Sequence, residues 1–219
     1  MNILIVGEAS DFLECKQKFG DLHAYSLAGD YHEVEERIAK QEVIFDFTIS
    51  QDSERINLYS GYPACTIFVD AAKTGLKKLT GKSAALQHVF GFAGMPTFLN
   101  RNIFEVCLPG DGQREHLAKV CQKLKTSFQV VEDNVGLVTP RVICMIINEA
   151  YYTVEEGTAT REDIDTAMKL GTNYPFGPFE WCQKIGIHHV CELLDAVYKD
   201  STDERYKMSQ LLTDEHLRN

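Results

Sequence analysis

The first segment that could bind a phosphorylated ligand is the loop after the N-terminal apolar run. The chain reads Val6-Gly7-Glu8-Ala9-Ser10-Asp11 there. A dinucleotide site needs several glycines, so that the backbone turns tightly and approaches a pyrophosphate at a helix N-terminus. Only Gly7 is present, and Glu8 and Asp11 would repel phosphates. The loop therefore predicts a helix capped by Ser10 or Asp11 rather than an NAD site.

Histidines and cysteines offer no catalytic or metal-binding pattern. The seven histidines are scattered in no spacing with Cys or Asp that suits zinc, so we predict no metal site. His88 and the pair His188-His189 could act as bases, but a solvent-facing strand residue and a solvated or packed pair are the simpler interpretations. The seven cysteines form no C-x-x-C pair and mostly lie in apolar runs, which indicates reduced thiols in a cytoplasmic protein.

A local basic patch is formed by Lys73, Lys77, Lys78 and Lys82, within and just after the sequence Ala72-Lys73-Thr74-Gly75-Leu76-Lys77-Lys78. Ammonium groups beside an apolar slot could hold a nucleotide phosphate, so Lys77 and Lys78 are candidate ligand-binding residues. The competing interpretation is an ordinary solvated helix face.

Strand-like and helix-like segments alternate through the first 132 residues. Short β-rich runs lie at Asn2–Val6, Leu22–Leu27, Val43–Thr48, Ala64–Val69, His88–Phe92, Ile103–Leu108 and Phe128–Val131. Helical spacing lies between several of them, at Asp11–Phe19, Tyr31–Lys40, Asp52–Tyr59 and Arg114–Lys125. This alternation predicts an α/β domain over residues 1–132, a reduced Rossmann-like parallel sheet with crossover helices.

From residue 133 to residue 219 the pattern becomes all-helical. A long apolar stretch, Val138–Val154, is typical of a buried helix with Pro140 in its first turn and Gly157 after its end. Thr160 begins a capping box for a helix that stops at Gly171. Further helices are expected at Phe179–Ile185 and, as the last one, at Val190–Tyr198. The predicted fold is therefore α/β followed by an all-α domain.

Composition and charge exclude several classes of protein. Of the 219 residues, 44% are hydrophobic and 25% are charged, which is typical of a globular protein and not of a fibrous or disordered one. The net charge is −10, divided as −3 over residues 1–132 and −7 over residues 133–219. Nucleic acid is therefore not an expected partner. No apolar run approaches the ~18 residues of a membrane span.

The C-terminal part resembles a known family. The stretches Ile147-Asn148-Glu149-Ala150, Glu162 to Gly171, and Asn173-Tyr174-Pro175-Phe176-Gly177-Pro178-Phe179-Glu180-Trp181 are similar to the C-terminal domain of 3-hydroxyacyl-CoA dehydrogenases. A terminal Arg205 to Leu212 stretch is similar to the second copy of that domain in bacterial 3-hydroxybutyryl-CoA and 3-hydroxyadipyl-CoA dehydrogenases. The chain resembles the C-terminal half of those proteins, a reduced Rossmann-like domain plus a helical domain.

The resemblance implies where a dehydrogenase would carry its catalytic groups. Such enzymes are expected to use a His base oriented by a Glu, with Ser and Asn binding the substrate oxygen. Glu105 matches the Glu position, and the family spacing places Ala93 at the His position. Pro140 stands at the Asn position, and Ala71-Ala72 lie near the Ser position. Only Glu105 remains as a catalytic remnant, and alanine cannot accept a proton.

The resemblance also implies a ligand and a partner. Tyr174, Pro175, Gly177, Pro178 and Trp181 belong to the turn that helps to line the acyl-CoA cleft in the family, although a rigid connection between helices is an equal alternative. The helical domain is the expected surface for a homodimer or for association with a full-length dehydrogenase.

We therefore expect a family member in acyl-CoA metabolism that is degenerate for hydride transfer, binds no cofactor, and acts in acyl-CoA binding or assembly. The alternative is an active NAD-dependent 3-hydroxyacyl-CoA dehydrogenase, with a site shared with a partner chain.

Overall fold

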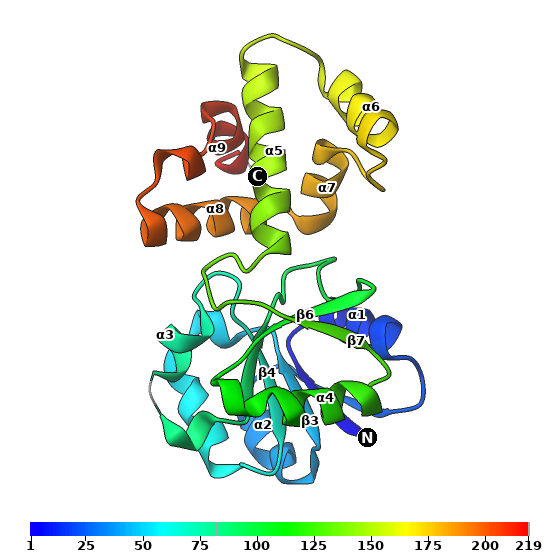
Figure 1. Cartoon of the computed structure of the whole chain (residues 1–219), viewed down its shortest axis with the longest axis vertical. Helices are drawn as coiled ribbons and strands as arrows, with labels where there is room; N and C mark the ends of the chain where they lie inside the picture. Colours follow the sequence, from blue (N-terminus) through cyan, green and yellow to red (C-terminus); the bar gives the residue numbers. More distant parts are fainter. Residues whose placement is uncertain (82, 219) are drawn as a thin grey trace. The chain divides into compact units, whose positions relative to one another are not determined.

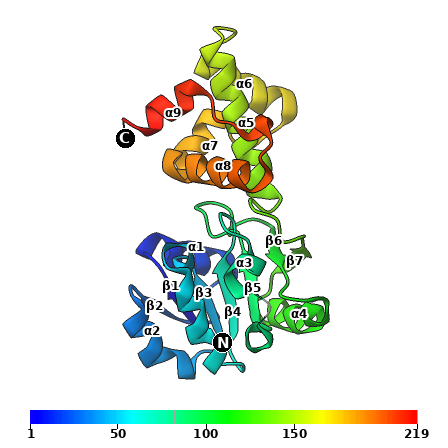
Figure 2. The ribbon, with the colours of Figure 1, turned by 90° about the vertical axis from the view of Figure 1, so that its left-hand side faces the viewer.

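A computed structural model describes residues 1–81 and 83–218 of the chain. The chain divides into two compact units, Met1–Leu137 and a second unit that begins at Val138. Figures 1 and 2 show a sheet unit in blue to green and a helical unit in yellow-green to red. Each unit is described here by itself.

The sheet unit is built on seven strands. They are β1 (Asn2–Val6), β2 (Ala24–Ala28), β3 (Val43–Asp46), β4 (Thr66–Asp70), β5 (Val89–Phe92), β6 (Ile103–Cys107) and β7 (Ser127–Val130). Their order in the sheet is β2-β1-β3-β4-β5-β6-β7, and neighbouring strands are parallel except for the antiparallel pair β5 and β6. The predicted fold class is confirmed, and the expectation of a parallel sheet is corrected at this one pair.

Helices connect the strands and cover the faces of the sheet. They are α1 (Ala9–Phe19), α2 (Tyr31–Arg37), α3 (Leu76–Thr80) and α4 (Arg114–Lys123), with short 3₁₀ segments at Ile38–Lys40, Ile49–Gln51, Ser53–Gly61, Ala84–Leu86 and Asp111–Gln113. The segment predicted as a helix at Asp52–Tyr59 is therefore a 3₁₀ segment, and α3 was not predicted because its five residues are too short to show a helical period.

Aromatic rings fill one side of the sheet and explain why its strands read as apolar runs. Phe45 stacks on Phe68 at 4.9 Å and on Phe19 of α1 at 5.0 Å, while Phe104 of β6 meets Phe68 edge to face. These rings belong to a cluster of buried residues that also takes side chains from α4. This side of the sheet is therefore buried beneath α1 and α4.

The helical unit is organised around its longest helix. Its elements are α5 (Thr139–Glu155), α6 (Arg161–Thr172), α7 (Pro178–Ile185), α8 (Ile187–Ser201), a 3₁₀ segment (Glu204–Tyr206) and α9 (Gln210–His216). Helix α5 packs against α7, α8 and α9, which lie beside it in both ribbon views (Figures 1 and 2).

Two details of the helical unit differ from the sequence prediction. The helix predicted to end at Gly171 ends at Thr172, with Asn173 in the left-handed conformation as its cap. The helix at Val190–Tyr198 is not the last, since α9 follows it. The polar stretch Thr213-Asp214-Glu215-His216 hid the apolar face of α9, which buries only Leu212.

All seven cysteines are buried and carry free thiols. Within residues 1–81 and 83–218, no helix is long and apolar enough to cross a membrane.

Candidate functional site

The order of the strands locates the place where a doubly wound sheet takes a nucleotide. Strand β1 has β2 on one side and β3 on the other, so the winding direction changes beside it. In such sheets, nucleotides bind in the crevice outside the carboxyl ends of the strands at this switch point. The residues that follow β1 and β3 are therefore the ones to test as a cofactor site.

The turn after β1 is closed by its own acidic side chain. Asp11 lies in the first turn of α1, and its Oδ2 accepts a hydrogen bond from the backbone nitrogen of Glu8 at 2.8 Å. The cap residue is Glu8, so the expectation of Ser10 or Asp11 as the cap is corrected by a few residues. Asp11 packs so tightly on Gly7 that a Cβ there would collide with its carboxylate.

The electrostatics of this turn oppose a phosphate. Burial, together with the nearby carboxylates of Glu8, Glu14 and Asp70, raises the pKa of Asp11 from 3.8 to about 6. A pyrophosphate would add negative charge where one carboxylate already resists ionisation. The residues present therefore do not fit a nicotinamide dinucleotide at this turn.

The strand register bears on the two positions that the family spacing assigned to His and Glu. Strands β5 and β6 pair Gly91 with Cys107 and Phe92 with Val106 in antiparallel register. Continued by one residue, this register sets Ala93 opposite Glu105. Ala93 is buried and Glu105 is half-buried. The position that the resemblance assigns to the His base therefore holds a methyl group, which cannot take a proton.

The other positions that the resemblance assigns to catalysis carry no hydroxyl or amide either. Ala71 and Ala72 are buried directly after β4, and Pro140 is buried in the first turn of α5. His88 does not replace the missing base. It lies before β5 begins, whereas Ala93 follows the other end of that strand, so about 15 Å of strand separates them. The expectation of a solvent-facing His88 is wrong, because the residue is buried with its Nε2 2.9 Å from the carbonyl oxygen of Tyr59.

The basic patch lies beside a helix N-terminus that is already occupied. Lys77 and Lys78 are exposed on α3, whereas Lys82 falls outside the described residues. Asp133 accepts hydrogen bonds from the backbone nitrogens of Leu76 and Lys77, both at 2.6 Å. The backbone donors that would complete a phosphate site beside these lysines are thus held by a carboxylate.

The aromatic turn of the helical unit is a packed connection. Trp181 is buried and meets Tyr174 at 5.4 Å and Phe176 at 6.2 Å, while Pro175 is exposed. Gly177 and Pro178, both buried, begin α7.

The start of α7 is held by Asp165 of α6. The carboxylate of Asp165 accepts hydrogen bonds from the nitrogens of Phe179 and Glu180 at 2.9 and 3.2 Å. The contact also explains Gly177, because a Cβ there would collide with Asp165. Asp165 and Gly177, which both lie in the stretches that resemble the family, therefore form the contact between α6 and α7.

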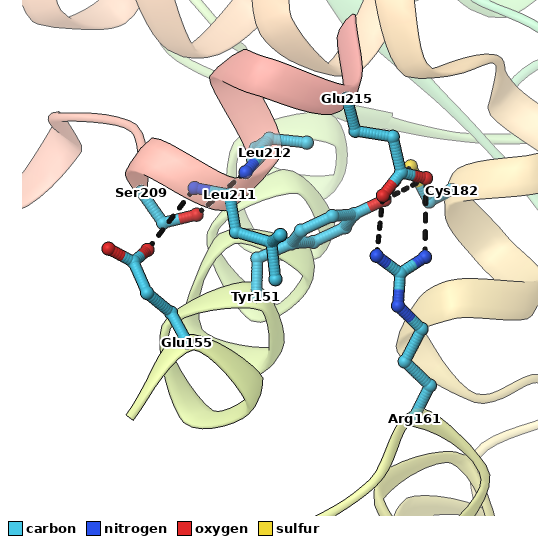
Figure 3. Close-up of polar contacts among 8 residues, drawn as sticks. All are labelled: Tyr151, Glu155, Arg161, Cys182, Ser209, Leu211, Leu212 and Glu215. Carbon is cyan, nitrogen blue, oxygen red and sulfur yellow. Dashed lines mark hydrogen bonds and ion pairs between the residues drawn. The ribbon is translucent and has the colours of Figure 1, made fainter. Parts of the chain in front are cut away.

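A pocket in the helical unit was not predicted from the sequence. It has a volume of about 470 Å³ and lies among α5, α6, α7 and α9, with Tyr151, Arg161, Phe179, Cys182 and Glu215 in its wall. Figure 3 shows Arg161 reaching across to Glu215, with the ring of Tyr151 beside them. No spacing in the sequence signals this pocket, because its walls come from residues up to 64 positions apart.

Arg161 is the centre of the contacts in this pocket. Its guanidinium donates to both carboxylate oxygens of Glu215, at 3.2 and 2.5 Å, and lies over the rings of Tyr151 and Phe179 at 5.2 and 5.0 Å. The hydroxyl of Tyr151 donates to Glu215 at 3.1 Å. Arg161 lowers the pKa of Glu215, which keeps the carboxylate charged.

The charge of the pocket wall does not suit a polyanion. Besides Arg161 and Glu215, the wall includes Glu162, Asp165 and Glu180, and Glu180 forms an ion pair with Lys169. The nucleotide end of an acyl-CoA carries several phosphates, which this wall would repel. The residues of the pocket thus connect α5, α6, α7 and α9 through polar contacts.

Buried polar contacts fix the segment before α9. The side chain of Asn148 on α5 donates from Nδ2 to the carbonyl of Lys207 at 2.9 Å and accepts from the nitrogen of Ser209 at 3.0 Å. Glu155 accepts from the nitrogen of Leu211, and Ser209 caps α9 by accepting from the nitrogen of Leu212 (Figure 3). Two stretches that resemble the family, the one around Asn148 and the one from Arg205 to Leu212, are therefore in contact.

Comparisons with known proteins agree with the resemblance. Residues 136–217 match the family described as 3-hydroxyacyl-CoA dehydrogenase, C-terminal domain. Over 104 residues, the chain is 38% identical to the 3-hydroxyadipyl-CoA dehydrogenase of Escherichia coli (strain K12), with 48% of this chain and 22% of that protein covered. It is 31% identical over 151 residues to the mitochondrial hydroxyacyl-coenzyme A dehydrogenase of Sus scrofa, with 66% and 48% covered. The chain spans less than half the length of these curated relatives.

A solved structure of similar fold is the (S)-3-hydroxybutyryl-CoA dehydrogenase from Ralstonia eutropha. It has a TM-score of 0.77 at 16% identity, with 99% of this chain and 93% of that chain covered. The two-unit architecture is therefore the fold of the 3-hydroxyacyl-CoA dehydrogenases. Within the chain, residues 136–217 are the part that matches the family of their C-terminal domains.

Proposed function

We propose that this chain is a member of the 3-hydroxyacyl-CoA dehydrogenase group that does not itself transfer hydride. The observation that carries the proposal is Ala93, which the register of β5 and β6 sets opposite Glu105. Loss of a general base alone costs about 10²–10⁴ in rate. The closed turn at Asp11, which does not fit the nicotinamide cofactor, supports the same conclusion.

The helical unit carries the proposed role. It keeps the family signature, and its polar joints at Asp165, Arg161 and Asn148 hold the helices in a defined arrangement. We propose that this unit completes a dehydrogenase assembly, as a homodimer or with a full-length dehydrogenase. Acyl-CoA binding is the second role that the resemblance suggests, and it would require phosphate contacts outside the acidic pocket.

Sedimentation of the whole chain at several concentrations, with and without acetoacetyl-CoA, tests the proposed role. A dimer at micromolar concentration supports the assembly role. A monomer at all concentrations that binds acetoacetyl-CoA would instead favour the ligand-binding role. A monomer that binds none, alone or mixed with a full-length dehydrogenase of the group, would contradict both.

An active NAD-dependent dehydrogenase is the second candidate. It is favoured by the match to the hydroxyacyl-coenzyme A dehydrogenase of Sus scrofa over 66% of this chain, and by the retained Glu105. In that case a partner chain would have to supply the base and the cofactor site.

A cytoplasmic location is proposed from the seven buried, free thiols, which suit a reducing compartment.

A further inference from the structure

Helix α5 has an open face besides the face that packs against α7, α8 and α9. Its buried side chains, among them Ile143, Ile147 and Tyr151, lie on the packed face. The open face consists of residues in alternating steps of four and three, each exposed or half-buried: Val138, Val142, Met145, Glu149 and Tyr152. Steps of four and three are the spacing along the contact between two packed helices. The open face therefore has the pattern of a helix–helix contact.

The N-terminal half of the open face is apolar. Val138 is 52% exposed and Val142 is 50% exposed. Met145 is half-buried and lies one turn beyond Val142. Residues three and four apart are neighbours on a helix surface, so these side chains adjoin one another. Adjoining exposed apolar side chains mark a contact site more often than isolated ones do.

The two halves of this helix carry opposite charges. Within α5, Arg141 is the one basic residue, and the acids Glu149 and Glu155 lie in the C-terminal half. The guanidinium of Arg141 has a fixed place, because it donates to the hydroxyl of Tyr206 at 3.2 Å and lies over that ring. In the acidic half, burial and then the nearby glutamates raise the pKa of Tyr152.

A second copy of α5, turned antiparallel, matches both halves. Arg141 and Glu149 each lie four residues from Met145, on opposite sides of it. A two-fold axis beside Met145 therefore brings Arg141 of each copy opposite Glu149 of the other. Antiparallel helices also place the positive end of one helix dipole near the negative end of the other. The charges of α5 are thus complementary to those of its own copy.

We propose that a second copy of this chain docks antiparallel on the open face of α5. Val142 and Met145 lie at the centre of the contact. Arg141 of each copy pairs with Glu149 of the other. Because both copies use the same face, the contact closes as a dimer and does not extend into a filament. This inference rests on the proposed function and deepens it, since it assigns the homodimer of the helical unit to one face.

Charge reversal in mixed copies tests the pairing. Arg141→Glu and Glu149→Arg each set like charges opposite one another at two places, and each should raise the dissociation constant of the dimer about tenfold. Mixed in equal amounts, the two variants should form a heterodimer that recovers most of the wild-type affinity. Sedimentation equilibrium of each variant and of the mixture measures this. A merely structural role of either residue would not be restored by mixing.

A substitution at the centre of the face tests the apolar part. Val142→Lys would bury an ammonium group in the contact and should raise the dissociation constant about 30-fold or more. Leu170→Lys is the matched control, because Leu170 is 83% exposed on α6, outside the open face. It should leave the dissociation constant within about twofold, as an exposed substitution does. Circular dichroism shows that each variant is folded.

Three results would overturn the inference, and they separate it from the proposed function. A dimer that tolerates Val142→Lys and both charge reversals would use another surface, and the homodimer role would stand. Reversal variants that dissociate and do not recover on mixing would contradict the antiparallel pairing. A wild-type monomer at all concentrations would overturn this inference together with the homodimer role.

Discussion

Asp11 and Glu8 close the first turn of α1 on themselves, since a carboxylate oxygen of Asp11 lies 2.8 Å from the backbone nitrogen of Glu8. In a dinucleotide-binding sheet this turn would face a pyrophosphate. Here the backbone nitrogen of Glu8 is bound by the carboxylate of Asp11, which is itself partly buried.

Asparagine at position 11 should stabilise the sheet unit at neutral and alkaline pH. The folded chain holds the Asp11 proton with a pKa of about 6, above its ordinary 3.8, so stability is lost as the pH rises from 3.8 through 6. Asp11→Asn keeps a hydrogen-bond acceptor without the charge. At pH 8 it should add about 1–2 kcal/mol to the free energy of unfolding of the sheet unit, after allowance for solvent screening.

Amide hydrogen exchange in β1 and β3 measures this effect at pH 8. Thermal unfolding followed by circular dichroism should show the same gain at pH 8 and none at pH 3, where the wild-type carboxyl is already protonated. Asp21→Asn serves as the exposed control and should change little at either pH. An equal gain at both pH values for Asp11→Asn would show that the charge is not the cause.

Removal of Arg161 should loosen α9 from the rest of the helical unit. Arg161→Ala loses the paired hydrogen bonds to Glu215 and the contacts with the rings of Tyr151 and Phe179, and should cost about 1–2 kcal/mol. Trp181 is the single tryptophan of the chain, so urea unfolding followed by its fluorescence reports on this unit.

A double-mutant cycle separates the ion pair from the packing. Arg161→Ala with Glu215→Gln should give a coupling of about 0.5–1 kcal/mol above pH 5. The coupling should fall as the pH drops through the lowered pKa of Glu215, because the charged carboxylate is the partner. Lys199→Ala, which breaks an exposed pair with Asp195, is the control. A coupling near zero at pH 7 would rule out the pair as a joint.

Asn148 should be harder to replace than either member of that ion pair. It is 2% exposed, and Asn148→Ala leaves the carbonyl of Lys207 and the nitrogen of Ser209 without their buried partner. The expected cost is about 2–3 kcal/mol. Amides of α9 should exchange faster in this variant, whereas those of the sheet unit should not change. Unaltered exchange in α9 would contradict the role assigned to Asn148.

Lys77 and Lys78 should contribute little to binding of acyl-CoA. Both are exposed, and the backbone donors beside them are held by Asp133. The double variant Lys77→Ala, Lys78→Ala should keep the affinity of the chain for acetoacetyl-CoA within about twofold, because solvent and salt screen exposed charges. Calorimetry measures the change, and a loss beyond that range would restore the basic patch as a phosphate contact.

The sequence predicted the elements with strong patterns. All seven strands were found from their β-rich runs, and β3, β4 and β5, which are buried at every residue, gave the unbroken hydrophobic segments. Helix α5 was found from its apolar length, with Pro140 in the first turn. The reversed direction of β6 could not be seen, because a strand has the same pattern in either direction, and only its pairing with β5 reveals it.

The candidate site was only partly visible in the sequence. The sequence shows that Gly7 is the single glycine of its loop and that Glu8 and Asp11 lie beside it. The family spacing also placed Ala93 at the position of the His base. The hydrogen bonds of Asp133 could not be predicted, because a capping aspartate and a catalytic one look alike until their donors are known. The Arg161–Glu215 joint was hidden for a similar reason, since it links residues 54 positions apart.

The central claim, that this chain does not transfer hydride, is tested most directly by calorimetry of the whole chain with NADH, alongside a spectrophotometric assay with acetoacetyl-CoA. The account predicts no heat of NADH binding and no oxidation of NADH. Saturable NADH binding accompanied by turnover of acetoacetyl-CoA would contradict it.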